Sequence, residues 1–491
     1  MGKSLINTKV VASVVGNQIM LTGFLMAFTI PISYYYGQDD FSALLISSLI
    51  TLVFGFLIKT ITRSHKNDEV KKREGFLIVA LGWVFMAIFG SLPYVLSGAI
   101  PNYTDAFFET ISGLTTTGAT ILNDIEALPK GVLFWRSMTQ WIGGMGIIVL
   151  TIAILPLLGV GGMELFASEA PGPTKDKIHP RIKETAKRLW LIYFSLTVLQ
   201  TILLMFPGGM DFYDAINHAL TTMSTGGFST KQASIAHFDS AIVDYIIIVF
   251  MLIAGTNFTL LYFGSKLKLK KFWRNDEFKW YIGAVLLLTV VIIPFVLKYY
   301  EGNVGLAKPF RDVLFQVISI ITTTGYATAD FTTWGTFVTF IFFLLLFTGA
   351  SAGSTSGGMK LVRIVLLMKN GFLEFKRRLH PNAVIPVTLN KESVQPKIIY
   401  NLLAFVFFYL TTFVVGSIIM TMLGVDFLES ISAAATSIGN VGPGIASIGP
   451  SGSFFHLPDP AKWVLSFLML MGRLELFTIA ILFTPYFWKR N

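Results

Sequence analysis

The stretch Asp312–Thr328, DVLFQVISIITTTGYAT, sets the interpretation of the whole chain. Its acidic first residue opens a helix-compatible run, which Gly325 closes thirteen positions later (325 − 312). The same spacing (118 − 105, 227 − 214 and 442 − 429) recurs in DAFFETISGLTTTGAT at 105–120, DAINHALTTMSTGGFS at 214–229 and ESISAAATSIGNVGPG at 429–444. Successive closing glycines lie 109, 98 and 117 residues apart, so the chain carries an internal repeat of about a hundred residues.

The sequence around these stretches is that of a membrane protein. Of 491 residues, 53% are hydrophobic and 13% are charged, and the mean hydropathy is +0.66, whereas soluble chains carry about 25% charged residues. A membrane-spanning helix needs about 20 mostly apolar residues. Ten runs are predicted to span: Met20–Tyr36, Leu44–Ile61, Phe76–Leu96, Trp141–Val160, Leu189–Phe206, Ile242–Phe263, Trp280–Leu297, Phe337–Met368, Ile399–Leu423 and Val464–Phe487.

The distribution of lysine and arginine predicts the orientation. Basic residues gather in four loops on one face of the predicted spans, at 62–75, 175–188, 266–279 and 369–397. The positive-inside rule makes that face cytoplasmic, and an even number of spans places both termini there. The rule also accounts for the net charge of +10 without nucleic acid as a partner. The N-terminus lacks a small-residue cleavage site after its apolar run, so we expect no removable signal peptide.

Several kinds of chemistry are excluded. The chain has no cysteine, so disulfides, thiolate metal sites and cysteine nucleophiles are impossible. Its six histidines are scattered without a paired ligand spacing, and no His, Ser or acid constellation converges. Neither a GxGxxG after a strand nor a Walker A motif occurs. We therefore expect no enzyme and no cofactor in this chain, and any nucleotide would bind a partner.

Each repeated stretch predicts a re-entrant half-helix. Ten to twelve residues of helix span about 15–18 Å, roughly half of the hydrocarbon thickness, so the chain must dip into the membrane and return. Irregular backbone at that depth survives only when it is buried in protein or lines a watery cavity. An acid at the start of the helix suits an N-cap, where it satisfies free N–H groups and the positive dipole end. We therefore predict four pore-helix caps: Asp105, Asp214, Asp312 and Glu429.

The glycines predict a ring of main-chain oxygens. Four negative helix ends that converge would favour a cation between them. Glycine tolerates positive φ, so successive carbonyls can face one direction, and inward carbonyls can replace the hydration shell of a cation. Because the closing triplets hold no acid, a large monovalent ion such as potassium suits them better than calcium.

At these four loops the sequence resembles the TrkH family of bacterial potassium-uptake proteins, within the Trk/Ktr/HKT superfamily. The two extra N-terminal spans and the segment GGMELFASEAPGPTKDKIHPRIKETA at 161–186 are similar to that family. The resemblance implies a filter at Thr116, Thr117, Gly118, Thr225, Gly226, Gly227, Thr323, Thr324, Gly325, Asn440, Val441 and Gly442. The fourth loop departs from the threonine pattern and places Pro443 after its glycine. We therefore expect potassium preference with measurable rubidium and some sodium permeation.

The eighth predicted span is interrupted by FTGASAGSTSGGMK at 347–360. Each of its glycines weakens a helix by up to about 1 kcal/mol relative to alanine, and a broken helix at membrane depth usually lines a cavity. The family resemblance implies a gate below the filter. Small residues also allow close helix packing, which is the alternative. The residues assigned to the gate are Gly349, Ser351, Gly353, Gly357, Gly358, Lys360 and Arg473.

Arg473 lies inside the last predicted span. A charge there costs at least a few kcal/mol and should face water or a partner. The resemblance implies that this arginine faces the pore below the filter. The alternative is an arginine that bonds the carbonyl ends of pore helices and holds the fold.

The expected fold is an all-α polytopic membrane protein with two additional N-terminal spans and four span–pore-loop–span repeats around one pseudo-fourfold pore. The expected boundaries are 1–70 for the additional spans and 71–180, 181–275, 276–390 and 391–491 for the repeats. A secondary transporter that couples potassium to proton or sodium is the main alternative, and it would need midplane carboxylates. Within the spans, Asp244 and Glu475 are the main acids.

The resemblance also implies partners and a location. They are a cytoplasmic TrkA-like RCK nucleotide-binding regulator, a second copy of the chain in a homodimer, and the bacterial inner membrane. Anionic lipid is an alternative partner for the basic loops.

Overall fold

The computed structural model describes the chain except for residues 1–5, 63–69, 155–181, 269, 301–304 and 490–491. The described residues form helices joined by loops, with one two-stranded sheet in which β1 (Thr388–Leu389) pairs antiparallel with β2 (Glu392–Ser393). The predicted all-α class is confirmed. Most of the segment at 161–186 and the end of the predicted span Trp141–Val160 lie outside the described residues.

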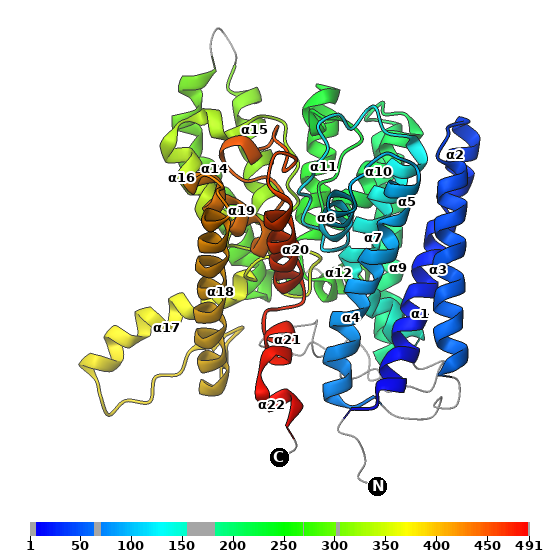
Figure 1. Ribbon diagram of the computed structural model, residues 1–491. Helices are drawn as coiled ribbons and strands as arrows, with labels where there is room; N and C mark the ends of the chain where they lie inside the picture. The colour runs from blue at the N-terminus through cyan, green and yellow to red at the C-terminus, as the bar shows by residue number, and fades with distance from the viewer. Residues whose placement is uncertain (1–5, 63–69, 155–181, 269, 301–304, 490–491) are drawn as a thin grey trace.

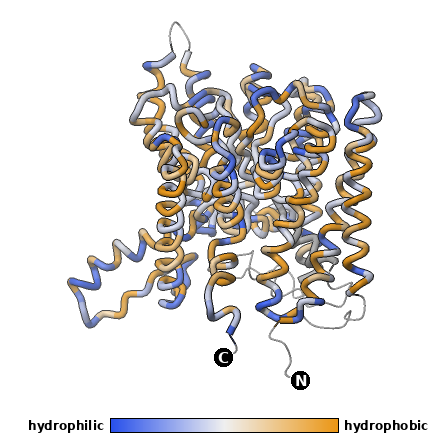
Figure 2. The backbone as a smooth tube through the Cα atoms, in the orientation of Figure 1, coloured by the Kyte–Doolittle hydropathy of each residue, from blue (hydrophilic) through white to orange (hydrophobic). Residues whose placement is uncertain are grey.

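The helices are long and apolar enough for a multi-pass membrane protein. Among the described residues six helices meet the length and hydropathy needed to cross a membrane, or up to eight when two bent pairs each count as one. Figure 2 shows hydrophobic residues along most of the peripheral helices and hydrophilic residues gathered at their ends and in the connecting loops. Two of the ten predicted spans have no counterpart in this count: Phe337–Met368 is broken, and Trp141–Val160 ends outside the described residues.

The N-terminal segment forms a hairpin at one side of the molecule (Figure 1). It consists of α1 (Thr8–Ala27), α2 (Ile30–Tyr36) and α3 (Phe41–Ile61), and α1 also packs on α4. Gly16 and Gly55 allow α1 and α3 to approach closely, because a Cβ on Gly55 would lie 2.7 Å from Gly16 O. Small residues serve this purpose where helices pack in lipid.

The remainder follows one order four times: an outer helix, a short re-entrant helix and an inner helix. The outer helices are α4 (Lys72–Gly90) with α5 (Leu92–Leu96), α9 (Ile182–Met205), α14 (Asp276–Val296) and α18 (Pro396–Met422). The re-entrant helices are α6 (Tyr103–Leu114), α10 (Phe212–Met223), α15 (Ala307–Ile321) and α19 (Phe427–Gly439). The predicted residue boundaries of the repeats stay predictions.

The inner helices are α7 (Lys130–Ile154), α11 (Ala241–Ala254) with α12 (Phe258–Ser265), α16 (Thr336–Leu345) with α17 (Leu361–Leu379), and α20 (Asp459–Arg473) with α21 (Phe477–Ala480) and α22 (Pro485–Trp488). The short elements α13 (Lys270–Arg274), η3 (Ser234–Phe238), η4 (Leu297–Tyr299), η5 (Phe331–Trp334), η6 (Ala446–Ile448) and η7 (Ile481–Phe483) complete the described structure.

Every inner helix breaks. The helix α7 has a non-helical residue at Gly146, and the chain leaves helix entirely between α16 and α17, as the sequence predicts. The axes of α11 and α12 differ by 108° and those of α20 and α21 by 109°. The predictions of continuous spans at Ile242–Phe263 and Val464–Phe487 were therefore wrong. Their hydropathy is high throughout, so composition alone does not reveal the bends.

The four units close into a ring. The re-entrant helix of each unit packs on the inner helix of the unit before it: α10 on α7, α15 on α11 and α6 on α20. The last closure brings α19 against the end of α16, where a Cβ on Gly439 would collide with Leu346 O. The inner ends of the four re-entrant helices thus meet at the centre of the molecule.

Candidate functional site

The re-entrant helices begin earlier than the sequence predicts. The side chains of Asn102, Asp211 and Asp426 accept hydrogen bonds from the free N–H groups at the N-termini of α6, α10 and α19. The helix α15 starts at Ala307 without a side-chain cap. The assignment of the four acids as N-caps was therefore wrong, because short polar residues three positions upstream take that role in three of the helices.

The four acids instead join each re-entrant helix to another segment. Asp105 forms a 2.5 Å ion pair with Lys462 of α20. Asp214 accepts a 2.6 Å hydrogen bond from Thr230 Oγ1, Asp312 one of 2.6 Å from Tyr300, and Glu429 lies 2.6 Å from His456 Nε2. Asp105, Asp214 and Glu429 lie in the first turn, where a carboxylate still favours the positive end of the helix dipole.

One backbone conformation recurs after all four re-entrant helices. A residue with left-handed φ stands two positions before a glycine that also has positive φ: Thr116 (53°) and Gly118 (84°), Thr225 (55°) and Gly227 (76°), Thr323 (55°) and Gly325 (81°), Asn440 (51°) and Gly442 (107°). The N–H between them donates back to the helix each time, from 117 to Ser112 O, 226 to Thr221 O, 324 to Ser319 O and 441 to Thr436 O, at 2.8–3.1 Å. Asparagine tolerates this left-handed conformation, so the departure at Asn440 preserves the geometry.

The four loops touch one another in cyclic order. A Cβ on Gly118 would collide with Gly226 O, one on Gly227 with Thr324 O, and one on Gly325 with Val441 O. The cycle closes at Gly442, where a Cβ would lie 2.6 Å from Thr117 O. Each glycine is thus required both by its φ and by the neighbouring backbone. The twelve residues predicted from the sequence are brought together as one ring of main-chain atoms.

One pocket opens onto this ring. Its lining includes all four glycines, Gly118, Gly227, Gly325 and Gly442. The charged side chains that line it are Arg136 and Lys231, and within the described residues no acid does so. The described lining therefore consists of the four glycines and of residues such as Thr120, Ser229 and Ser234, without a carboxylate.

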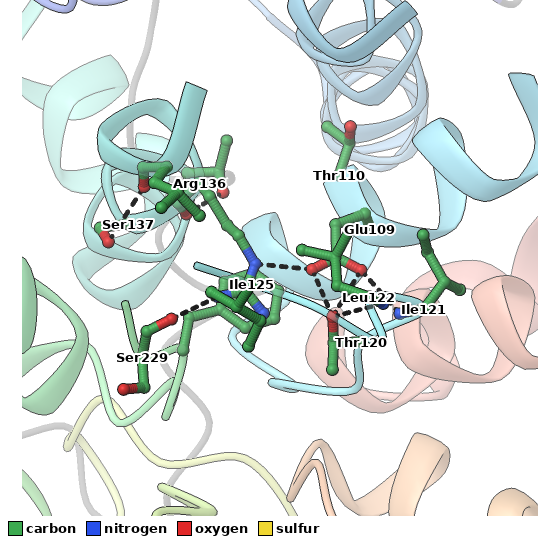
Figure 3. Close-up of polar contacts among 12 residues, drawn as sticks. Glu109, Thr110, Thr120, Ile121, Leu122, Ile125, Arg136, Ser137 and Ser229 are labelled. Carbon is green, nitrogen blue, oxygen red and sulfur yellow. Dashed lines mark hydrogen bonds and ion pairs between the residues drawn. The ribbon is translucent and has the colours of Figure 1, made fainter. Parts of the chain in front are cut away.

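A buried ion pair supports the first two loops beside the pocket (Figure 3). Arg136 Nε on α7 lies 2.7 Å from Glu109 Oε1 on α6, and the side chains are 2% and 0% exposed. Glu109 also accepts hydrogen bonds from Thr120 Oγ1 and the N–H of Ile121 after the first loop. Arg136 Nη1 donates to Ser229 O after the second loop at 3.0 Å. A charge inside an apolar helix usually marks such a site, and that signal could have predicted both residues.

The segment 347–360 lies against the ring. The N–H of Gly357 donates to Thr323 Oγ1 at 2.6 Å, and a Cβ on Gly357 would lie 2.7 Å from both Gly439 O and Asn440 Cβ. Thr355 Oγ1 donates to Met223 O, at the end of α10, at 3.1 Å. The segment therefore contacts the second, third and fourth loops or the helix ends that precede them.

The other predicted gate residues tie this segment to its surroundings. The N–H of Ser351 donates to Gly255 O at 3.0 Å, Gly353 O accepts from the N–H of Phe258 at 3.0 Å, and the N–H of Gly349 donates to Met359 O at 2.6 Å. Gly358 has φ of 61°. Buried Lys360 donates from Nζ to Ser356 O inside the segment. These bonds connect the segment to the break between α11 and α12.

Arg473 donates to three carbonyls. Its Nη1 bonds Thr355 O at 2.8 Å, and its Nη2 bonds Gly143 O at 2.5 Å and Gly144 O at 2.9 Å. The guanidinium therefore joins α20 to α7 and to the segment 347–360. These three partners are carbonyls of an inner helix and of the broken segment.

The sequence reasoning missed three of the four breaks in the inner helices, although a signal exists. A glycine stands 28 positions after each of the first three loop glycines, at Gly146, Gly255 and Gly353 (118, 227 and 325 plus 28). The first has φ of 69°, the second caps the end of α11, and the third has φ of 72° inside the broken segment. In the fourth unit Glu475 takes the positive φ, at 56°.

The fold and the site define a polytopic helical membrane protein in which four re-entrant loops of one chain meet around a shared pocket. Residues 42–490 match the TrkH family, described as a cation transport protein. The Trk system potassium uptake protein TrkH of Escherichia coli K12 is 41% identical over 485 residues, which cover 98% of this chain and 99% of that relative. The chain belongs to the TrkH family of cation transport proteins.

Further relatives agree along almost the full length. The Trk system potassium uptake protein TrkH of Vibrio parahaemolyticus is 43% identical over 433 residues, 87% of this chain and 88% of that relative. The crystal structure of the potassium transporter TrkH from Vibrio parahaemolyticus superposes with a TM-score of 0.87 at 39% identity, covering 98% of this chain and 100% of the other.

Proposed function

We propose that this protein carries potassium into the cell through one pore whose selectivity filter consists of main-chain oxygens from the four loops. The observation that supports this most is the fourfold recurrence of left-handed residue and positive-φ glycine around one pocket. Relatives at 41% and 43% identity are named potassium uptake proteins. Carbonyl rings replace the hydration shell of a permeating cation.

Helix dipoles favour a monovalent cation at this ring, and the two cationic side chains that line the pocket, Arg136 and Lys231, are paired with Glu109 and Asp214. The negative ends of α6, α10, α15 and α19 converge on the ring, and each helix terminus carries about half an elementary charge. Hard divalent ions are bound by several carboxylates, and none lines the pocket among the described residues. A neutral oxygen ring with dipoles behind it suits potassium, with rubidium and some sodium as weaker competitors.

The segment 347–360 is proposed as the gate of this pore. It lies at the inner ends of three of the four loops and is tied to Thr323, Met223 and Arg473 by single hydrogen bonds. Glycine-rich backbone without regular helix changes conformation at low cost. Movement of this segment would open or close the path below the filter.

The remaining expectations complete the proposal. The first described residues of α1 and the last of α22 lie at the same end of the molecule (Figure 1), in agreement with both termini in the cytoplasm. We propose a bacterial inner membrane as the location, and a cytoplasmic TrkA-like nucleotide-binding regulator and a second copy of the chain as partners, with the family relationship as the support. The basic loops on the proposed cytoplasmic face are the docking surface for the regulator or for anionic lipid.

Potassium and sodium flux into liposomes with the purified protein tests the proposal, with Gly325→Ser as the central variant. A side chain at Gly325 is strained at φ of 81° and would collide with Val441 O. Left-handed conformation costs a non-glycine residue roughly 1–2 kcal/mol, so potassium flux should fall roughly tenfold or more.

Gly371→Ser is the matched control, because Gly371 in α17 has no neighbouring atom within 4 Å of an added Cβ. Equal flux in the two variants would contradict a filter at Gly325. Single-channel recording distinguishes the pore from a coupled transporter, since discrete openings are incompatible with fixed stoichiometry.

A further inference from the structure

One side chain outside the four loops forms hydrogen bonds with the ring. Gln140 on α7 is fully buried, and its Nε2 donates to Gly226 O at 2.6 Å. Its Oε1 accepts from the N–H of Phe228 at 3.0 Å. The two bonds fall on either side of Gly227, the closing glycine of the second loop, so the carboxamide braces that loop from behind.

The donor and acceptor pattern fixes the orientation of the carboxamide. A carbonyl oxygen only accepts and a backbone N–H only donates. The NH2 of Gln140 must therefore face Gly226 O and its oxygen must face the N–H of Phe228. A rotation of the amide by 180° would lose both hydrogen bonds. The carboxamide of Gln140 is thus held in one orientation. A residue that only filled space would not need a fixed orientation.

The second loop lacks the side chain that the other loops carry at this place. The residue before the closing glycine is Thr117 in the first loop, Thr324 in the third and Val441 in the fourth, and it is Gly226 in the second. A Cβ on Gly226 would lie 2.7 Å from Gln140 Nε2 and would collide with Gln140 Cδ and Oε1. The carboxamide therefore occupies the space of the missing side chain.

The other three units carry no such group at the same distance along the sequence. Gln140 lies 22 residues after Gly118, and the same offset from the next three closing glycines leads to Val249, Phe347 and Val464. None of these can donate or accept a side-chain hydrogen bond. Gln140 therefore stands apart from the residues at that distance in the other units.

We propose that Gln140 is a specificity-determining positioning residue, which fixes the Gly226 carbonyl and substitutes for the filter side chain that the second loop lacks. This rests on the proposed function, because it concerns the same ring. A carbonyl oxygen has two lone pairs, and Gln140 occupies one of those on Gly226. The carbonyl therefore presents a fixed direction and a reduced field to an ion in the ring.

The consequence concerns discrimination between ions. Gly226 and Gly227 are adjacent glycines, which make the backbone of this loop permissive. Without Gln140 the Gly226 carbonyl can turn toward a smaller ion, so the ring adapts to sodium. We expect Gln140→Ala to lower the potassium-to-sodium flux ratio roughly three- to tenfold, as one lost hydrogen bond would, with potassium flux retained.

The experiment uses the full chain in liposomes with potassium, rubidium and sodium as the probes. Gln140→Leu retains a comparable volume but removes both hydrogen bonds, and should lower the ratio as Gln140→Ala does. Val249→Ala is the control on another inner helix, because the Val249 side chain on α11 is 49% exposed and lies away from the ring, and it should retain the wild-type ratio.

Variants of Gly226 and Gln140 test directly whether the carboxamide takes the place of a filter side chain. Gly226→Thr alone should abolish flux because its side chain collides with Gln140. The double variant Gly226→Thr with Gln140→Ala places a threonine where the first and third loops have one, and should recover potassium flux. Gly226 does not have positive φ, so the backbone admits threonine.

The outcomes separate this inference from the proposed function. If the wild-type protein carries potassium selectively and both Gln140 variants keep its flux ratio, the role of Gln140 is wrong and the proposed function stands. Wild-type liposomes without potassium flux would overturn both. If Gly226→Thr is tolerated alone, or if the double variant is no better than Gly226→Thr, Gln140 does not occupy the place of a filter side chain.

Discussion

Single residues of the ring hold a strained backbone conformation. Thr116, Thr225 and Thr323 hold left-handed φ of 53–55°, a conformation that costs an ordinary residue about 1–3 kcal/mol. Each persists because the next N–H is bonded to its re-entrant helix and because a neighbouring loop occupies the adjacent space. The surrounding contacts hold these residues in the strained conformation. In the proposed function, this conformation orients the main-chain oxygens of the filter.

Removal of one charge from the buried pair at the first loop should destabilise the protein. Glu109→Gln leaves the Arg136 guanidinium, 2% exposed, without its counter-ion. Breaking a buried ion pair costs about 3–5 kcal/mol, so thermal unfolding in detergent should shift clearly to lower temperature.

Glu374→Gln provides the control for the loss of a carboxylate. Glu374 pairs with Arg377 on the surface of α17 and is 51% exposed, and exposed pairs contribute about 0–1 kcal/mol. Similar unfolding temperatures for the two variants would show that the Glu109–Arg136 pair contributes little.

At the scale of elements, the inner helices have the most informative features. All four change direction near the ring, at Gly146, after Ala254, between α16 and α17, and after Arg473. Arg473 bridges two of these places, through Gly143 and Gly144 on α7 and through Thr355 in the segment 347–360. The breaks and this bridge belong to one layer of the structure directly below the loops.

Arg473→Ala should raise basal potassium flux. The substitution removes the bond from Nη1 to Thr355 O and a positive charge from the layer below the loops, so both the attachment of the segment and the barrier for a cation decrease. Liposome flux and single-channel conductance measure the effect, with about a severalfold increase expected from the loss of hydrogen bonds worth roughly 1 kcal/mol each. Arg377→Ala on the surface of α17 should leave flux unchanged. A normal unfolding temperature together with wild-type flux would contradict the proposal for Arg473.

The accuracy of the sequence predictions depended on the kind of interaction. The acid-to-glycine spacing placed all four loops correctly, because a positive-φ turn after a short helix needs glycine at a fixed distance. The caps were misplaced because a first-turn acid and an N-cap acid look alike in sequence, and Asp211 and Asp426 precede the acids by three positions. Gln140 could not be predicted, since its partners Gly226 and Phe228 lie 86 and 88 residues away in sequence.

At the scale of the whole molecule, the proposed orientation predicts which loops face the cytoplasm and which face the outside of the membrane. The chain contains no cysteine, so a single introduced thiol reports its own exposure to a membrane-impermeant maleimide. Ala127 follows the first loop and Ala383 follows α17, and both are exposed. Ala127→Cys should react in intact cells, and Ala383→Cys only after the membrane is permeabilised.

Both variants exchange an exposed alanine for a cysteine, so each serves as the control for the other and neither should change flux. Labelling of Ala383→Cys in intact cells, with Ala127→Cys protected, would reverse the proposed orientation. Labelling of both would place the two loops on the same side and contradict the number of crossings.

Because one polypeptide supplies all four quadrants, a mutation changes only one of them at a time. In an assembly of identical subunits a single codon change appears four times around the axis, and a mild defect is multiplied. Here Asn440 departs from the threonine pattern in one quadrant, while Thr116, Thr225 and Thr323 keep it in the other three. Successive substitutions can therefore change the ion preference of the proposed pore one loop at a time.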